Sequence, residues 1–256
     1  MDTVDFSVEN KVAYITLNRP EKLNALNHQM VADIFSAFHE VRENPDIWVA
    51  VLSGQGRAFS TGHDLNMGFG ARQQEGRPSG NTDDLYVFLG ETWKPIIAAC
   101  NGYCLAQGAG LALMSDIRIA SESTQFGWPQ VKRGIPSISG PTILSQYVPL
   151  GFAFKTLFSG ELFSAQEAYR VGLVQEVVPD DQLMERARDL ANTIAENAPL
   201  AVSTIKKAAI TGMAIPSLAE RTKNSAKYAA EIRDSEDSKE GLLAFAEKRA
   251  PKFVGR

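Results

Sequence analysis

Short apolar runs that stop at a glycine or a polar residue place the strongest constraint on how this chain folds. Residues 48–54 (WVAVLSG), 95–102 (PIIAACNG) and 116–121 (DIRIAS) are such runs, and their length and β-branched content are typical of buried strands. Another strand is predicted over residues 11–20, and the amphipathic helix after it has Asn27 as its N-cap. Because these strands alternate with helical segments, the sequence predicts βα units and a mostly parallel sheet, an α/β fold.

The pattern becomes helical in the second half of the chain. Ser164 and Glu167 form a capping-box pattern at the start of a helix. One last strand is predicted over residues 173–179, and the segments after it have helical periodicity. We therefore predict an α/β core over residues 1–195, followed by a C-terminal helical region over residues 196–256.

Composition excludes several classes of protein. The 256 residues are 44% hydrophobic and carry a net charge of −4, which suits one large domain or a core with a small appendage. Lys and Arg are scattered, so we expect no nucleic-acid partner. The apolar runs are too short to span a bilayer and the first ten residues do not resemble a secretory signal, so we expect no membrane partner and a cytoplasmic location. Cys100 and Cys104 lack a companion His/Cys pair, which predicts buried reduced thiols and no metal site.

Residues 68–84 (GFGARQQEGRPSGNTDD) are rich in glycine and polar side chains, and they predict a mobile loop. Polar side chains occur at the end of this loop and in the helix after it, namely Asp83, Asp84, Tyr86 and Glu91. We expect one of them to reach inward. Glu91 is the carboxylate to test, although a Glu side chain is more often exposed.

Two glycine-rich turns each follow a predicted strand. They are residues 56–65 (GRAFSTGHDL) and 101–113 (NGYCLAQGAGLAL), and the second leads through Gly108 and Gly110 into a short apolar helix. N–H groups at a helix N-terminus lack intrahelical partners, so one N–H from each turn can converge on a single oxygen and stabilise negative charge there. Taken alone, either turn is more often a tight turn without function. A dinucleotide-binding fingerprint fits worse, because its third glycine would fall at Leu113.

These turns and the segments around them resemble a known family, the crotonase superfamily, also called the enoyl-CoA hydratase/isomerase family. The resemblance covers nearly the whole chain. It implies a crotonase-like spiral of ββα units, a C-terminal helical trimerisation region, and a homotrimer or dimer of trimers. It also implies an acyl-CoA thioester as substrate, with coenzyme A as part of the substrate and no separate cofactor. The segments that carry it are LNRPEKLNAL, GRAFSTGHDL, KPIIAACNGYCLAQGAGLALMSDIRIAS, QFGWPQVKRGIP, SAQEAYRVGLVQEVVP and AFAEKRAPKF.

The resemblance further implies roles for particular residues. The two backbone N–H donors of an oxyanion hole match His63 and Gln107, which Gly108 follows; the family normally has glycine at the position of Gln107. The His63 side chain is expected to be a bystander, although imidazole would suit a general base. For Lys248, a solvated charge at a helix end is an equal alternative to a phosphate contact. The residues expected to contact CoA or the acyl group are Lys22, Leu23, Ala25, Asp64, Leu65, Trp128, Ser137, Phe245 and Lys248.

Two positions depart from the pattern of the family's hydratases. Those enzymes carry two glutamates, at the positions that match Gly110 and Gln130, and neither residue here is a carboxylate. Glycine has no side chain, and an uncharged amide cannot act as a base at neutral pH. The acid of the family's isomerases matches Ile138, and the tyrosine of some decarboxylases lies near Ser137. Gln130 keeps the capacity to orient a water molecule or to hold a substrate carboxylate.

The resemblance therefore implies a reaction through a thioester enolate held by backbone N–H groups. Loss of CO2 from a malonyl-type thioester forms such an enolate without a base, and the STGHD turn resembles that of methylmalonyl-CoA decarboxylases. Hydration loses roughly 10²–10⁴-fold in rate for each missing acid or base. Three hypotheses stay open: an enoyl-CoA hydratase-like lyase, an acyl-CoA decarboxylase, and an acyl-CoA binder without catalysis.

Overall fold

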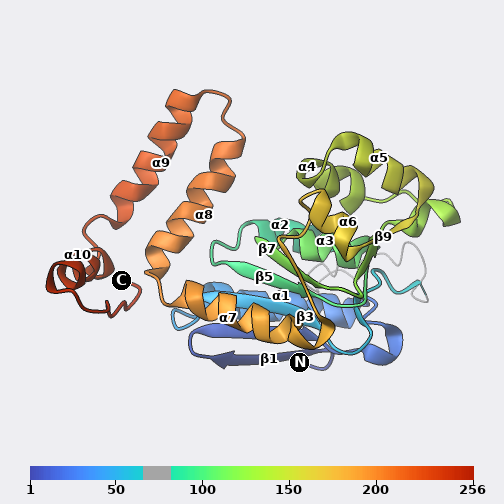
Figure 1. The fold of residues 1–256 in the computed structure, drawn as a ribbon, viewed down its shortest axis with the longest axis horizontal. Helices are drawn as coiled ribbons and strands as arrows, with labels where there is room; N and C mark the ends of the chain where they lie inside the picture. Colours follow the sequence, from blue (N-terminus) through green and yellow to red (C-terminus); the bar gives the residue numbers. More distant parts are fainter. Residues whose placement is uncertain (66–81) are drawn as a thin grey trace, which may run out of the picture.

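A mostly parallel sheet lies at the centre of the molecule, as predicted. The structure is a computed structural model that describes residues 1–65 and 82–256. In order across the sheet, its described strands are β1 (Val4–Glu9), β2 (Val12–Leu17), β3 (Val49–Gly54), β5 (Ile96–Cys100), β7 (Ile117–Ser121) and β10 (Glu176–Val178) (Figure 1). β1 pairs antiparallel with β2, and the pairs that follow it are parallel.

A second, smaller sheet consists of three-residue strands. In order of pairing they are β4 (Ala58–Ser60), β6 (Tyr103–Leu105), β8 (Gln125–Gly127) and β9 (Leu162–Ser164). β4, β6 and β8 pair in parallel, and each follows a strand of the main sheet in the chain. With α2 (Thr82–Gly90) after β4 and α3 (Ala106–Leu113) after β6, the chain repeats a ββα unit. The expected crotonase-like spiral is confirmed.

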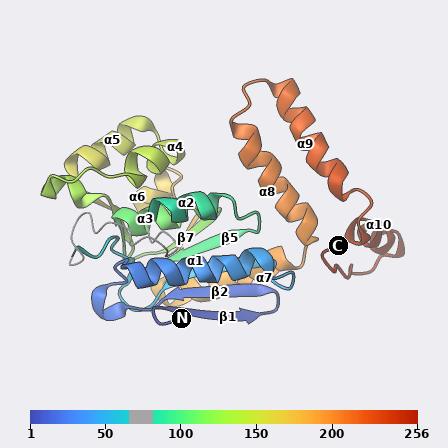
Figure 2. The same cartoon turned by 180° about the vertical axis from the view of Figure 1, so that it is seen from behind.

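Different helices cover the two faces of the main sheet. α1 (His28–Glu43) packs on β1 and β2, and α7 (Leu183–Ala195) packs on β2, β3, β5 and β7 from the other side (Figures 1 and 2). α1 begins as predicted, because the Asn27 side chain accepts the Met30 N–H at 2.8 Å. Alternate residues of β3 enter two separate hydrophobic clusters, one on each face of the sheet.

The predicted loop over residues 68–84 lies mostly outside the described residues. Its last residues, from Thr82 on, do not belong to a loop but begin α2. Leu85 and Leu89 are fully buried in the main hydrophobic cluster, and this anchoring explains why the helix starts before the polar segment ends.

Short helices connect the layers of the core. The Ser164 hydroxyl accepts the Glu167 N–H at 3.2 Å, so the N-cap bond of the predicted capping box is present, whereas the Glu167 carboxylate accepts hydrogen bonds from Arg170. Cys100 and Cys104 are buried free thiols, also as predicted. The connecting elements are η1 (Pro20–Lys22), η3 (Pro129–Arg133), η4 (Gly140–Leu144), α4 (Ser145–Tyr147), α5 (Leu150–Ser159), α6 (Ala165–Arg170) and η5 (Asp180–Gln182).

The C-terminal helices project from the core. They are α8 (Pro199–Met213), α9 (Leu218–Ile232) and α10 (Glu236–Glu247). α8 and α9 form a hairpin that points away from the main sheet, and α10 lies beyond it (Figures 1 and 2). Across the described parts of the chain, no helix combines the length and apolar character that a membrane span requires.

Candidate active site

The two predicted glycine turns meet at the carboxyl ends of β4 and β6. These strands pair in parallel, with Ser60 beside Cys104, so the segments that leave them start from the same edge of the second sheet. Gly62 in the first turn has a φ of +87°, and Ala106 at the start of α3 has a φ of +54°. A Cβ atom at Gly62 would lie 2.8 Å from the Ala106 Cβ and 3.0 Å from the backbone nitrogen of Gln107. The backbones of the two turns therefore lie in contact.

The backbone around this contact is held in different ways on the two sides. α3 begins without a side-chain cap, so the Gln107 N–H lies in a first turn where no intrahelical acceptor exists. On the other side, His63 forms a parallel bridge with Leu26. The bridge uses the Gly62 carbonyl and the Asp64 N–H, and it therefore fixes the backbone of His63 without using the His63 N–H.

Both glycines of α3 allow close approach of neighbouring groups. A Cβ atom at Gly108 would lie 2.5 Å from the backbone oxygen of Ser60, so this glycine lets α3 contact β4. A Cβ atom at Gly110 would lie 2.5 Å from the Tyr86 hydroxyl oxygen and 2.6 Å from the Ser139 Cβ. The space that a side chain at position 110 would enter is therefore filled by two hydroxyl-bearing residues.

These hydroxyl groups bond to the first turn of α3. Tyr86 donates its hydroxyl proton to the Gln107 carbonyl at 2.9 Å. The Ser139 hydroxyl donates to the Ala106 carbonyl at 3.3 Å and accepts the Trp128 indole N–H at 3.0 Å. The Trp128 ring is buried in the main hydrophobic cluster. Its indole N–H therefore helps to fix the position of the Ser139 hydroxyl.

The segment after Trp128 places its predicted site residues in different environments. Gln130 lies in η3, and within the described part of the chain its buried Oε1 atom accepts no hydrogen bond. The Ser137 hydroxyl accepts the Gly140 N–H at 3.0 Å and so stabilises the start of η4. Ile138 is exposed. Ser139, rather than Ser137, is the hydroxyl that contacts α3.

The electrostatics of the first turn favour an uncharged imidazole. Burial and the nearby charge of His28 lower the pKa of His63, and Asp64 opposes this shift. Asp64 is itself buried and lies 3.3 Å from the Arg19 guanidinium. Leu65, the next residue, is half exposed. His63 is therefore mostly neutral at pH 7.

The predicted CoA-binding turn adjoins the first glycine turn. Lys22, Leu23 and Ala25 flank the buried residue Asn24, whose left-handed φ of 53° turns the chain. The Ser60 hydroxyl donates to the Asn24 carbonyl at 2.7 Å, which ties the two turns together. Lys22 is exposed, whereas Leu23 and Ala25 are half-buried.

Comparison with known proteins identifies the family. Residues 7–256 match the family model described as Enoyl-CoA hydratase/isomerase. The chain belongs to the enoyl-CoA hydratase/isomerase family. It is 41% identical to (E)-benzylidenesuccinyl-CoA hydratase of Thauera aromatica, over 98% of this chain and 99% of that protein. It is 34% identical to 2,3-dehydroadipyl-CoA hydratase of Escherichia coli K12, over 100% of both chains. A crystal structure of enoyl-CoA hydratase from Bacillus anthracis, 30% identical, has a TM-score of 0.92 and covers 99% of this chain and 100% of that chain.

Two residues that are predicted to contact CoA lie far from the other predicted site residues of this family member. Phe245 lies in α10 and Lys248 follows it, and both are at the opposite end of the molecule from α3 (Figures 1 and 2). The α8–α9 hairpin carries α10 away from the core, which is the physical reason for the separation. Phe245 is 86% exposed in the single chain.

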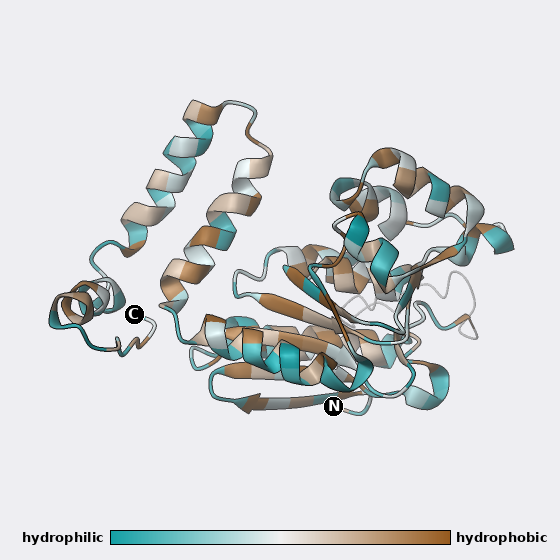
Figure 3. Cartoon of the chain, in the orientation of Figure 1, coloured by the Kyte–Doolittle hydropathy of each residue, from teal (hydrophilic) through white to brown (hydrophobic). Residues whose placement is uncertain are grey.

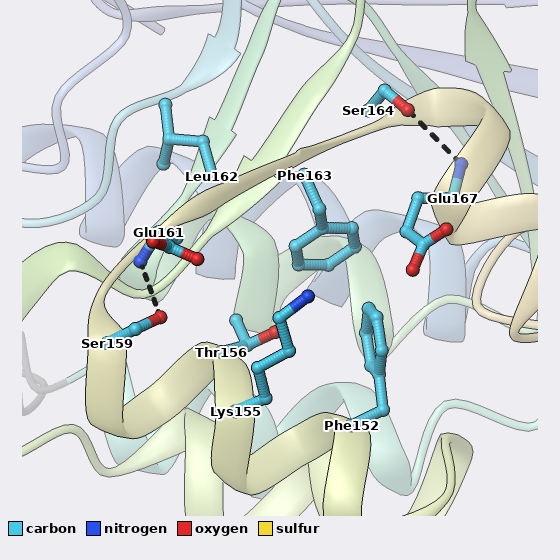
Figure 4. Close-up of a pocket in the computed structure, with 9 residues that line it drawn as sticks. All are labelled: Phe152, Lys155, Thr156, Ser159, Glu161, Leu162, Phe163, Ser164 and Glu167. Carbon is cyan, nitrogen blue, oxygen red and sulfur yellow. Dashed lines mark hydrogen bonds between the residues drawn. The ribbon is translucent and has the colours of Figure 1, made fainter.

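Two small cavities lie apart from the meeting point of the turns. One, of about 200 Å³, lies between α5 and β9, where Phe152 and Phe163 form part of its wall (Figure 4). The other, of about 260 Å³, lies at the ends of β3 and β7 and includes Asn101 and Asp180. None of the predicted site residues lines either cavity. Among residues 1–65 and 82–256, no three His, Cys, Asp or Glu side chains are grouped as metal ligands.

Sequence reasoning identified some of the site's polar residues and missed others. Of the residues near the 68–84 loop, Tyr86 reaches inward, whereas Glu91 is exposed. Arg19 and Asn24 were not predicted, although they hold the first turn and the CoA-binding turn together. An asparagine in a turn sequence is the one signal that could have indicated Asn24, since Asn tolerates a left-handed φ.

Proposed function

We propose that this chain is an enzyme that converts an acyl-CoA thioester through an enolate, whose oxygen is held by the N–H groups of His63 and Gln107. The contact between Gly62 and Gln107 supports this proposal, because the residue that precedes His63 lies beside the backbone nitrogen of Gln107. Fixed donors of this kind stabilise charge as it develops on the thioester oxygen. Loss of one such donor in other enzymes costs on the order of 10²–10³-fold in rate.

Hydration of an enoyl thioester is the reaction that we propose first. The names of the Thauera aromatica and Escherichia coli relatives support it, and both names denote acyl groups derived from dicarboxylic acids. Neither Gly110 nor Gln130 supplies a carboxylate, so a second carboxylate on the substrate would accept the proton of the attacking water in their place. In this proposal the Gln130 Oε1, which is buried and accepts no hydrogen bond within the described residues, accepts the other hydrogen of that water. The proposed substrate is therefore a CoA thioester of an unsaturated dicarboxylic acid.

Decarboxylation is the second candidate, and a specific observation favours it. The space beside Gly110 is filled by the neutral side chains of Tyr86 and Ser139. A malonyl-type thioester loses CO2 without a base, and the enolate that remains needs only charge stabilisation and a proton. Both candidate reactions thus use a thioester that carries a free carboxylate.

The proposal includes assembly into a homotrimer or a dimer of trimers. α9 buries none of its residues within its own chain, and Gly212 alone is buried in α8. Further copies of the chain that cover these helices would bring Phe245 and Lys248 to the CoA site of a neighbour. The buried thiols of Cys100 and Cys104 suit the reducing cytoplasm, where we place the enzyme.

Mass spectrometry of turnover with three thioesters tests the proposed reaction. The thioesters are (E)-benzylidenesuccinyl-CoA, crotonyl-CoA and methylmalonyl-CoA, and each is incubated separately with the purified protein. We expect the benzylidenesuccinyl thioester to gain one water at least about 10²-fold faster than crotonyl-CoA, which lacks the second carboxylate. Loss of CO2 from methylmalonyl-CoA without hydration of the other two would favour decarboxylation. Binding without any conversion would show an acyl-CoA binder and contradict the proposal.

A further inference from the structure

The Tyr86 hydroxyl lies beside the backbone that holds the enolate oxygen, and we propose that it donates the proton to the α-carbon of the enolate. The inference rests on the proposed function, because it assigns a residue to that reaction. It concerns a step that hydration and decarboxylation share, since both end with a new C–H bond at the α-carbon.

The position of Tyr86 is set by the same residue that supplies an N–H to the enolate oxygen. Tyr86 comes from α2, is 6% exposed, and donates its hydroxyl proton to the Gln107 carbonyl at 2.9 Å. The N–H of Gln107 lies against Gly62 at the contact of the two turns. The proton donor and the oxyanion donor are therefore held in a fixed relation through one residue.

Gly110 leaves room for this hydroxyl. It lies one helical turn beyond Gln107 and hence on the same face of α3. Because it has no side chain, the Tyr86 oxygen approaches to 2.5 Å from the point where a Cβ atom would be. The hydroxyl thus takes the place of the side chain that any other residue at position 110 would direct toward the site.

Tyr86 is a stronger acid than Ser139 and Gln130, the other polar residues considered at this part of α3. A phenol has an ordinary pKa of about 10, whereas the aliphatic hydroxyl of Ser139 is a far weaker acid. The Gln130 amide does not ionise. The α-carbon of a thioester enolate is much more basic than a phenolate, so transfer of the Tyr86 proton to it is downhill.

The proposed step balances for both reactions. In hydration, the water oxygen bonds to the β-carbon and the electron pair of the C=C bond moves into the enolate. The substrate carboxylate takes the proton that the attacking water releases. The Tyr86 O–H bond then breaks, its proton bonds to the α-carbon, and the proton held by the substrate carboxylate passes to the phenolate and restores the phenol. In decarboxylation, the electron pair of the bond to CO2 forms the enolate, and the phenolate recovers its proton from water.

Tyr86→Phe tests the inference, with Tyr169→Phe as the matched control. Tyr169 is 55% exposed on α6 and belongs to none of the site segments. The substrate is whichever of (E)-benzylidenesuccinyl-CoA, crotonyl-CoA and methylmalonyl-CoA the wild type converts, and butyryl-CoA serves as an unreactive thioester for binding. We expect Tyr86→Phe to lower kcat at least about 10²-fold while KM and the Kd for butyryl-CoA change less than about threefold. Tyr169→Phe should behave as the wild type.

Turnover in D2O separates proton donation from a purely positioning role. With Tyr86 as donor, the wild type adds deuterium to one face of the α-carbon, and the residual product of Tyr86→Phe loses this single configuration, as read by NMR. A single configuration retained in Tyr86→Phe would overturn the inference, and so would a kcat equal to that of Tyr169→Phe; either result leaves the proposed function standing. Binding by the wild type without conversion of any of the three thioesters would overturn both.

Discussion

At the scale of single residues, position 110 has no room for a side chain. Gly110→Ala would place a methyl group 2.5 Å from the Tyr86 oxygen and 2.6 Å from the Ser139 Cβ, and overpacking of this kind costs about 1–3 kcal/mol. Gly151→Ala in α5 is the matched control, because a Cβ atom there has nothing within 4 Å. We expect Gly110→Ala to lower the free energy of unfolding in urea and Gly151→Ala to leave it unchanged or raise it by about 0.5–1 kcal/mol. Equal effects would contradict the packing described around α3.

The burial of His63 predicts a dependence of stability on pH. Burial and His28 lower the pKa of His63 in the folded state, while in the unfolded chain a histidine has a pKa of about 6.5. As the pH falls below about 6.5, the unfolded state binds a proton that the folded state excludes, so the free energy of unfolding decreases until the folded pKa is passed. We expect urea unfolding at pH 7.5 and 5.5 to show a smaller decrease for His63→Gln than for the wild type.

His39→Gln is the control for this measurement, because it removes an exposed histidine from α1. Comparison of the two variants separates the effect of the surroundings of His63 from the mere loss of a histidine. An unaltered pH dependence in His63→Gln would show that burial of this imidazole does not couple to folding.

Residue roles were predictable from sequence where backbone conformation decides them. Gly62, Gly108 and Gly110 were recognised because glycine in a turn signals close approach of a backbone. The sequence predicted that one of four residues near the loop would point inward, but it did not identify Tyr86 as that residue. The face of a helix that points inward depends on packing between elements that are distant in sequence. The second carboxylate that the reaction needs is a property of the proposed substrate, so no residue pattern reveals it.

At the scale of elements, strand length decided what the sequence could predict. Strands β3, β5 and β7 of the main sheet were visible because apolar runs of five or six residues fill their buried faces, whereas the mostly exposed strand β1 was not predicted. The strands of the second sheet are three residues long, which is too short for a period of two to be recognised. Their pairing nevertheless builds the site, because β4 and β6 direct the two glycine turns to the same edge.

An ion pair joins the C-terminal helices to the main sheet. The Lys206 ammonium of α8 lies 2.7 Å from the Asp116 carboxylate and donates to the Lys94 carbonyl at 3.0 Å. Burial lowers the pKa of Lys206, and Asp116 opposes this shift. Asp116 also accepts the Ile96 N–H at 2.8 Å. Asp116 thus has a structural role just before β7, because it binds both the Lys206 ammonium and the Ile96 N–H.

Removal of the Asp116 carboxylate should loosen this connection. Asp116→Ala removes the acceptor of the Ile96 N–H and the counter-charge of the Lys206 ammonium, and we expect a loss of about 1–3 kcal/mol in the free energy of unfolding. Asp116→Ala combined with Lys206→Met should lose less than the sum of the single variants, since the charge is no longer stranded. Glu167→Ala, which breaks the exposed pair with Arg170, should cost much less. A strictly additive double variant would show that the pair does not couple α8 to the sheet.

At the scale of the whole molecule, the C-terminal helices expose apolar side chains that the core does not cover. Helices of this length are rarely stable in water without tertiary packing. The hydropathy of the projecting helices in Figure 3 shows apolar positions along α8, α9 and α10. A surface of this kind marks an interface, and in our proposal other copies of the chain cover it. The large apolar side chains concerned, each more than two-thirds exposed, are Ile205, Met213, Leu218, Leu242 and Phe245.

Assembly and thioester binding should therefore fail together when α10 is altered. Leu242→Glu combined with Phe245→Glu places two charges on the exposed apolar side of α10, and we expect sedimentation to change from a trimer or hexamer of the 27.9 kDa chain to monomers. Lys239→Glu adds an acidic side chain at an exposed polar position of the same helix and should leave the assembly intact. Because Phe245 would lie at the CoA site of a neighbouring copy, the Kd for butyryl-CoA should rise in the double variant alone. A monomeric wild type would contradict the proposed assembly. A monomeric double variant with wild-type affinity would show that the CoA site is complete within one chain.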